Sequence, residues 1–155
     1  GMSQREGSVE TYVRYSREPI CAPIIGRGGA DVVLGLEALE ALRAADFLKK
    51  GGKMVMNTQE IDPMPVITGK AAYPGGIPAR LEGLGIEVVA AGALEIAREA
   101  GNLKAANVVM IGVLSGLPEF REDFEEEDWK EALRACVPGK SLEMNLRAFE
   151  AGRKL

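Results

Sequence analysis

Residues 30–58 read ADVVLGLEALEALRAADFLKKGGKMVMNT, and this stretch predicts a strand, a helix and a second strand. Residues 31–34 are a short apolar run closed by a glycine, which is typical of a strand buried on both faces. In the helix that follows, leucines recur every three residues, and we expect Gly51 and Gly52 to end it. Residues 53–57 form the second apolar strand. Two strands joined by a helix lie parallel with a right-handed crossover, so the stretch predicts an α/β fold.

The rest of the chain extends this pattern into a three-layer fold. Residues 9–15 alternate apolar and polar side chains, and with residues 20–25 they predict an antiparallel hairpin. We expect a mainly parallel central sheet carrying this hairpin, with helices on both faces. The further expected elements are a short extended piece at 65–68, a helix at 77–84, a strand at 86–90 and a helix at 93–100.

A nearly all-apolar helix is predicted for residues 103–115, capped by Asn102, and such a helix is buried on all sides. Asn107 stands inside this run. It therefore needs a structural hydrogen bond within the fold or serves a site or a subunit contact. Two amphipathic helices follow, one with an inward stripe of Trp129, Leu133 and Cys136 and one over residues 141–151. One row of the apolar helix is made mostly of small residues, which suit the close approach of another backbone: Ala105, Val109, Gly112 and Gly116.

The composition excludes several kinds of chemistry. The 155 residues include no histidine, which removes Ser-His and Cys-His nucleophile pairs and every histidine-containing metal site. Cys21 and Cys136 are the only thiols, too few to bind an iron-sulfur cluster or a four-cysteine zinc site, and we expect both to be buried and inert. The net charge of −4 argues against a nucleic-acid surface. No apolar run has the length of a membrane span and no leader opens the chain, so we expect a cytoplasmic protein.

Motifs for chemistry are also missing, and we expect no catalytic and no metal-binding residue in this chain. There is no Walker loop, no GxSxG elbow and no GxGxxG after a strand. The acidic segment 118–128 precedes a helix, where negative charge complements the helix dipole, and this explanation is preferred to cation binding. The best candidate for contact with an anion or a partner is the loop between Gly1 and Gly7, with Gln4 and Arg5; the alternative is a solvated loop.

Several pieces of sequence together resemble the gamma-type domain of the 2-oxoacid:ferredoxin oxidoreductases, and they are most similar to the beta subunits of the indolepyruvate ferredoxin oxidoreductases. The resemblance runs from the first residue to the last and is specific in combination, although each piece is weak alone. The pieces are GMSQR at 1–5, VR at 13–14, ADVVLGLE at 30–37, EALR at 40–43, NT at 57–58, GN at 101–102, ANVVMIG at 106–112 and NLRAFEAG at 145–152.

This resemblance implies a division of labour between subunits. Thiamine diphosphate, magnesium, the iron-sulfur clusters and coenzyme A are expected in a catalytic alpha subunit, which forms an acyl-coenzyme A from a 2-oxoacid. This chain would bind none of them and would contact ferredoxin only indirectly. The partner-facing or coenzyme-facing candidates are Gly1, Met2, Gln4, Arg5, Gly7 and Asn107.

The chain departs from the family pattern at its start. The strand, GxGGQG loop, helix and strand that usually precede the GMSQR piece are missing, and Glu6 stands where the family tends to have glycine. We therefore expect one gamma-type domain over residues 1–155 with an open sheet edge, covered by a second copy or by the partner subunit.

Two functions follow as hypotheses, and a third, an enzyme, would require a carboxylate or lysine with a perturbed pKa in a cleft. The first is an accessory subunit of an indolepyruvate-type 2-oxoacid:ferredoxin oxidoreductase, which docks onto the thiamine-dependent subunit. The second is a stand-alone α/β domain that binds a small molecule such as a nucleotide or coenzyme A. Binding of such a ligand by the isolated chain would distinguish the second from the first.

Overall fold

Three parallel strands form the centre of the structure, a computed structural model that describes residues 8–155. The strands are β1 (Ala30–Gly35), β2 (Leu48–Asn57) and β3 (Glu87–Ala91), and they lie in the order β1-β2-β3. Both pairs are parallel, with Val33 beside Met54 in the first and Val55 beside Val89 in the second. The parallel α/β fold predicted from residues 30–58 is therefore confirmed.

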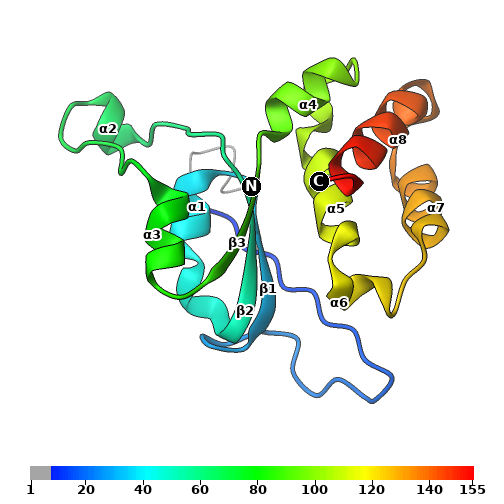
Figure 1. Ribbon diagram of the computed structural model, residues 1–155, viewed down its shortest axis with the longest axis horizontal. Coiled ribbons are helices and arrows are strands. Elements are labelled where there is room, and N and C mark those ends of the chain that lie inside the picture. The colour runs from blue at the N-terminus through cyan, green and yellow to red at the C-terminus, as the bar shows by residue number, and fades with distance from the viewer. Residues whose placement is uncertain (1–7) are drawn as a thin grey trace.

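The middle strand β2 divides the apolar interior into two clusters. Met54, Val55 and Met56 are each 0% exposed, so both faces of the strand are covered. Because successive side chains of a strand point to opposite faces, Met54 and Met56 pack on one side and Val55 on the other. Covering both faces requires a layer of helices on each side, and this gives the three layers seen in Figure 1.

The first layer is small and consists of α1 (Ala38–Arg43) and α3 (Ile77–Gly83). Ala38, Ala41, Ile77 and Leu81 of these helices are buried against Met54 and Met56. Between β2 and α3 the chain makes an excursion that contains the single-turn helix α2 (Met64–Ile67), which stands away from the sheet in Figure 1.

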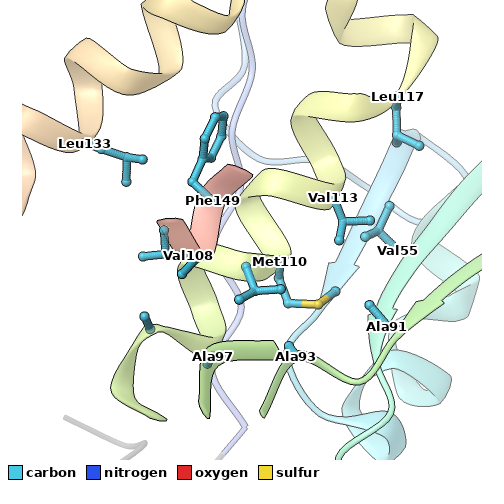
Figure 2. Close-up of a cluster of buried hydrophobic side chains, with 13 residues drawn as sticks. Val55, Ala91, Ala93, Ala97, Val108, Met110, Val113, Leu117, Leu133 and Phe149 are labelled. Carbon is cyan, nitrogen blue, oxygen red and sulfur yellow. The ribbon is translucent and has the colours of Figure 1, made fainter. Parts of the chain in front are cut away.

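The second layer is larger. It contains α4 (Ala93–Glu99), the 3-10 turn η3 (Leu103–Ala105), α5 (Ala106–Gly116), α6 (Pro118–Arg121), α7 (Glu126–Cys136) and α8 (Gly139–Arg153). Figure 2 shows Val113 of α5 facing Val55 of the sheet, while Phe149 and Leu133 lie on the other side of α5. Helix α5 is thus covered on two opposite sides, by the sheet and by the outer helices, although its first turn leaves Asn107 exposed.

Two glycines allow α5 and α8 to touch along their backbones. A Cβ atom at Gly112 would lie 2.2 Å from the carbonyl oxygen of Phe149, and one at Gly152 would lie 2.1 Å from that of Val109. Neither distance is possible for a real side chain, so both positions require glycine in this packing. The predicted close approach of another backbone at Gly112 is confirmed, and the neighbour is α8.

The predicted helix over residues 36–50 is wrong in its second half. Helix α1 ends at Arg43, the 3-10 turn η2 (Ala45–Phe47) follows, and the lysines and glycines at 49–52 belong to β2. The register between β1 and β2 shifts here, so that Ala30 pairs with Leu48 but Val32 pairs with Lys53. Gly51 has φ +79° and a Cβ at Gly52 would meet the Ala30 carbonyl oxygen at 3.0 Å, so the glycines form a bulge and not a helix end.

The predicted hairpin is also wrong, because residues 8–29 contain no strand. This segment, which we call the arm, is instead fixed by aromatic contacts at two points. The ring of Tyr12 lies 6.0 Å from that of Phe47, and the ring of Tyr15 lies 5.1 Å from that of Phe124. Val9 and Val13 remain exposed, so the alternating pattern does not bury one face.

Two smaller expectations are wrong, and three predicted elements are confirmed. Residues 65–68 are not extended, because α2 begins at Met64 and Pro65 is tolerated in a first helical turn, whose N–H groups have no partner within the helix. Cys21 and Cys136 are both exposed, since one lies in the arm and the other at the last residue of α7. The elements predicted at 77–84, 86–90 and 93–100 correspond to α3, β3 and α4.

No helix in the described part of the chain combines the length and the apolar character that a membrane crossing requires.

Replacing Gly112 by alanine should lower the free energy of unfolding by about 2 kcal/mol or more, because the added methyl group forces α5 and α8 apart. Urea denaturation followed by circular dichroism measures this change. Gly139→Ala at the start of α8 is the matched control. It has no neighbour within 4 Å, so it should leave stability unchanged or raise it by roughly 0.5 kcal/mol. Equal stability of the two variants would contradict the close packing.

Candidate functional site

The carboxyl ends of the three strands meet at one edge of the sheet. Strand β1 runs into Leu36 and Glu37, β2 ends at Asn57, and β3 leads through Gly92 into α4. In open α/β sheets this edge is where ligands and partners bind, because the loops that follow parallel strands gather there. It is therefore the candidate functional site of this chain.

Asn57 connects the three loops at this edge. Its side chain is 3% exposed, its Nδ2 donates to the Leu36 carbonyl oxygen at 3.1 Å, and its Oδ1 accepts from the Ala93 backbone N–H at 3.1 Å. The N–H of Gln59 also donates to Oδ1, at 3.4 Å. One buried amide thus holds the loop after β1, the start of α4 and the loop after β2 in fixed relative positions.

Glu37 and Tyr73 form a second connection at the same edge. The Glu37 carboxylate caps α1 by accepting from the Glu40 N–H at 2.9 Å, and it accepts from the Ile61 N–H at 3.1 Å and from the Tyr73 hydroxyl. The Tyr73 oxygen in turn accepts from the Leu39 N–H at 3.0 Å. These bonds attach both ends of the excursion between β2 and α3 to helix α1.

The two titratable groups of this connection hold fixed protonation states at neutral pH. Burial alone would raise the pKa of Glu37, but the Tyr73 hydroxyl and the backbone N–H groups of Glu40 and Ile61 donate to the carboxylate and keep its pKa below its usual range. Burial and the adjacent Glu37 carboxylate raise the pKa of Tyr73. The carboxylate is therefore ionised and the phenol protonated, so the pair serves as a permanent hydrogen bond and not as an acid-base couple.

Two surface hollows lie elsewhere on the molecule, at the arm and at the end of α8. Their volumes are about 430 Å³ and about 250 Å³. In the smaller one the charges pair with each other, since Arg153 Nε lies 3.2 Å from a Glu126 carboxylate oxygen. The larger is lined by Tyr15, Ser16, Arg17, Asp123 and Phe124, and the smaller by Arg121, Glu126, Glu150, Arg153 and Lys154.

The structure places the predicted site residues as follows. The loop candidates Gly1, Met2, Gln4, Arg5 and Gly7 lie outside the described residues. Asn107 lies in the first turn of α5 and is exposed, so the alternative of a buried structural hydrogen bond does not apply, while the alternative of a site or subunit contact stays a prediction. Its neighbours Val108 and Val109 turn inward while Asn107 faces solvent.

Asn57, Glu37 and Tyr73 were not among the predicted site residues. The sequence could have indicated Asn57, because an asparagine at the end of a buried parallel strand lies at the ligand-binding edge of the sheet. Glu37 follows β1 in the same way. Tyr73 had no such signal, since it follows Asn57 by sixteen positions in a proline-rich segment.

The described residues contain no group of three acidic or cysteine side chains that could hold a metal ion. The acidic residues at 125–128 act as a helix start: the Glu125 N–H donates to the Asp128 carboxylate at 2.7 Å, and Glu125 caps the N–H of that residue in return.

Comparison with known proteins gives a consistent result along the whole chain. The family model described as pyruvate ferredoxin/flavodoxin oxidoreductase matches residues 1–155. The chain is 43% identical to indolepyruvate oxidoreductase subunit IorB of Thermococcus kodakarensis, over 99% of this chain and 76% of that protein. It is 41% identical to the IorB subunit of Archaeoglobus fulgidus, over 98% of this chain and 75% of that protein.

Two further matches are to a longer subunit of another oxidoreductase and to a solved structure. The chain is 30% identical to ketoisovalerate oxidoreductase subunit VorA of Methanothermobacter thermautotrophicus, over 98% of this chain but 28% of that protein. Among solved structures, the gamma subunit of a keto/oxoacid ferredoxin oxidoreductase from Geobacter sulfurreducens matches with a TM-score of 0.63 and 20% identity. That match covers 90% of this chain and 65% of the solved one, and at this identity it supports the fold.

Replacing Asn57 by alanine should lower the free energy of unfolding by roughly 2–3 kcal/mol, because it leaves the buried Ala93 N–H and Leu36 carbonyl without partners. Thermal or chemical denaturation measures the loss. The exposed Asn107 offers a matched control, and Asn107→Ala should change stability by less than about 0.5 kcal/mol. If both alanine variants were equally stable, Asn57 would not connect the loops.

The stabilisation from Glu37 should depend on pH. Because the pKa of Glu37 is lower in the folded chain, its contribution is complete above the unfolded-state pKa of 4.5 and is lost as the pH falls through the folded-state value. Glu37→Gln should therefore cost about 1 kcal/mol at pH 7 and less at pH 3. Denaturation at both pH values, with the exposed Glu82→Gln on α3 as control, measures this. A cost that does not change with pH would contradict it.

Proposed function

Because this chain belongs to the pyruvate ferredoxin/flavodoxin oxidoreductase family, we propose that it is the small, accessory subunit of an indolepyruvate-type 2-oxoacid:ferredoxin oxidoreductase. It acts by docking onto a larger subunit that oxidatively decarboxylates the 2-oxoacid to an acyl-coenzyme A. The chain itself positions and completes that subunit and carries out no chemical step.

One observation carries this proposal: the similarity to IorB subunits extends over almost the whole chain and exceeds 40% identity in two organisms. The VorA match adds that the same region occurs as about a quarter of a longer subunit. A module found both as most of a small subunit and as part of a large one is expected to work inside an assembly.

The chemistry of the side chains supports a division of labour. An iron-sulfur cluster needs four thiolates and this chain has two cysteines, so the residues present do not fit a cluster. The chain has no histidine, and in the Glu37–Tyr73 pair a carboxylate with a lowered pKa faces a phenol with a raised pKa, which does not suit proton transfer between them at neutral pH. We place thiamine diphosphate, magnesium, the iron-sulfur clusters and coenzyme A in the larger subunit, which passes electrons to ferredoxin.

The remaining predictions about this complex concern its contacts. The loop with Gly1, Met2, Gln4, Arg5 and Gly7 is proposed to face the larger subunit or coenzyme A, and Asn107 lies on an exposed surface that is open to a subunit contact. The indolepyruvate substrate, the cytoplasmic location and the oligomeric state stay predictions.

Mixing the purified chain with its larger subunit should give a stable complex that reduces ferredoxin when indolepyruvate and coenzyme A are supplied. Neither chain should do so alone. Size-exclusion chromatography with light scattering measures the association, and the absorbance of ferredoxin measures the reaction. Oxidation of a 2-oxoacid by this chain alone would contradict the proposal.

The same preparation tests the alternative of a stand-alone binding domain. In a thermal-shift experiment, coenzyme A or a nucleotide should leave the Tm of the isolated chain unchanged if the ligand sites belong to the larger subunit. A clear rise in Tm, together with a failure to bind the larger subunit, would favour the stand-alone domain.

A further inference from the structure

The excursion between β2 and α3 presents an apolar stripe to solvent. We call residues 59–73 the α2 hook. Ile61, Met64 and Ile67 recur every three residues along it and are 57%, 49% and 62% exposed. Leu36, which follows β1 at the same edge of the sheet, is 51% exposed. Neither of the two core clusters includes these side chains. A group of exposed apolar side chains on one segment is a candidate surface for binding another molecule.

The hook has a defined position in spite of its distance from the core. At its start, the Gln59 carbonyl oxygen accepts from the Ala38 N–H at 2.9 Å and the Ile61 N–H donates to Glu37. At its end, the Tyr73 hydroxyl donates to the same carboxylate.

Hydrogen bonds within the hook close it on itself. The N–H groups of Lys70 and Ala71 both donate to the Pro65 carbonyl oxygen, at 2.8 Å and 3.0 Å. The stripe is therefore preorganised, so little conformational entropy is lost when a partner binds it.

The charges around the stripe indicate what kind of surface it fits. Glu60 and Asp62 flank Ile61 and are both exposed, and Glu37 lies beside them. The single lysine of the hook, Lys70, comes near the other end of its sequence. A complementary surface is an apolar groove with lysine or arginine at the rim that faces Glu60 and Asp62. A second copy of this chain also carries a net charge of −4. Its negative charge would repel Glu60 and Asp62, so it is a less complementary partner.

We propose that the α2 hook is the docking element of this chain, and that Ile61, Met64 and Ile67 insert into an apolar, basic-rimmed groove of the larger subunit. This inference rests on the proposed function and names the surface through which it acts. Asn57, Glu37 and Tyr73 hold the hook at the edge of the sheet through the hydrogen bonds described above.

Binding measurements with stripe variants test this assignment. Met64→Ser and Ile67→Ser remove exposed side chains, so the chain should fold as before, while its Kd for the larger subunit should rise about tenfold or more. Leu84→Ser is the matched control: Leu84 is 68% exposed after α3, and its replacement should leave the Kd within about twofold. Biolayer interferometry with the purified larger subunit measures both. Wild-type affinity in the stripe variants would overturn the assignment of the hook.

Charge reversal provides an independent readout. Glu60→Lys combined with Asp62→Lys should slow association with the larger subunit about tenfold at low salt and flatten its dependence on ionic strength. Glu131→Lys, an exposed position on α7, should leave both unchanged. If both charge variants associate at the same rate, the basic rim is refuted.

Two outcomes separate this inference from the proposed function. If the wild-type chain does not bind the larger subunit at all, the proposed function fails and the hook assignment fails with it. If the wild type binds and the stripe variants bind equally well, the subunit role stands and the hook is not the docking element. If light scattering shows a dimer of the chain alone that Ile67→Ser dissociates, the hook joins two copies, which also overturns the proposal.

Discussion

Strand β2 has apolar side chains on both faces, and the need to cover both of them fixes the position of the other elements. Met54 and Met56 need one layer of helices and Val55 needs another, so helices must pack on both sides of the sheet. The neighbouring strands β1 and β3 run parallel to β2, because two strands joined through a helix run in the same direction. Three carboxyl ends then meet at one edge, where Asn57 connects their loops.

The sequence predicted this architecture well where the pattern of apolar residues was decisive. The strand at 53–57, the buried helix that became α5 and its small-residue row all have the positions and roles expected. The failures come from residues with more than one structural use. Glycines often end helices, as was expected of Gly51 and Gly52. Here these two residues form a bulge in β2. The alternation in the arm resembles a strand, yet its aromatic side chains pack individually against Phe47 and Phe124.

The candidate site was harder to predict than the fold, for a physical reason. Asn57 and Glu37 matter because three segments converge on them, and that convergence exists only after the strands have paired. Tyr73 reaches Glu37 from thirty-six positions away through a loop with no periodic pattern. Asn107 was singled out because its neighbours are apolar, but the turn of α5 directs it to solvent. In this chain, the polar residue at the end of a buried strand connects several segments, and the polar residue inside an apolar run does not.

The division of the interior by β2 also has a dynamic consequence. The cluster around α5 and α8 contains thirteen buried residues and the cluster around α1 and α3 contains six, and the two share no member. We therefore expect the smaller layer to open at a lower free energy than the larger one. In deuterated water its amides would exchange well before those of α5 and α8. Any molecule that holds the α2 hook in place would slow that exchange, since the hook is attached to α1.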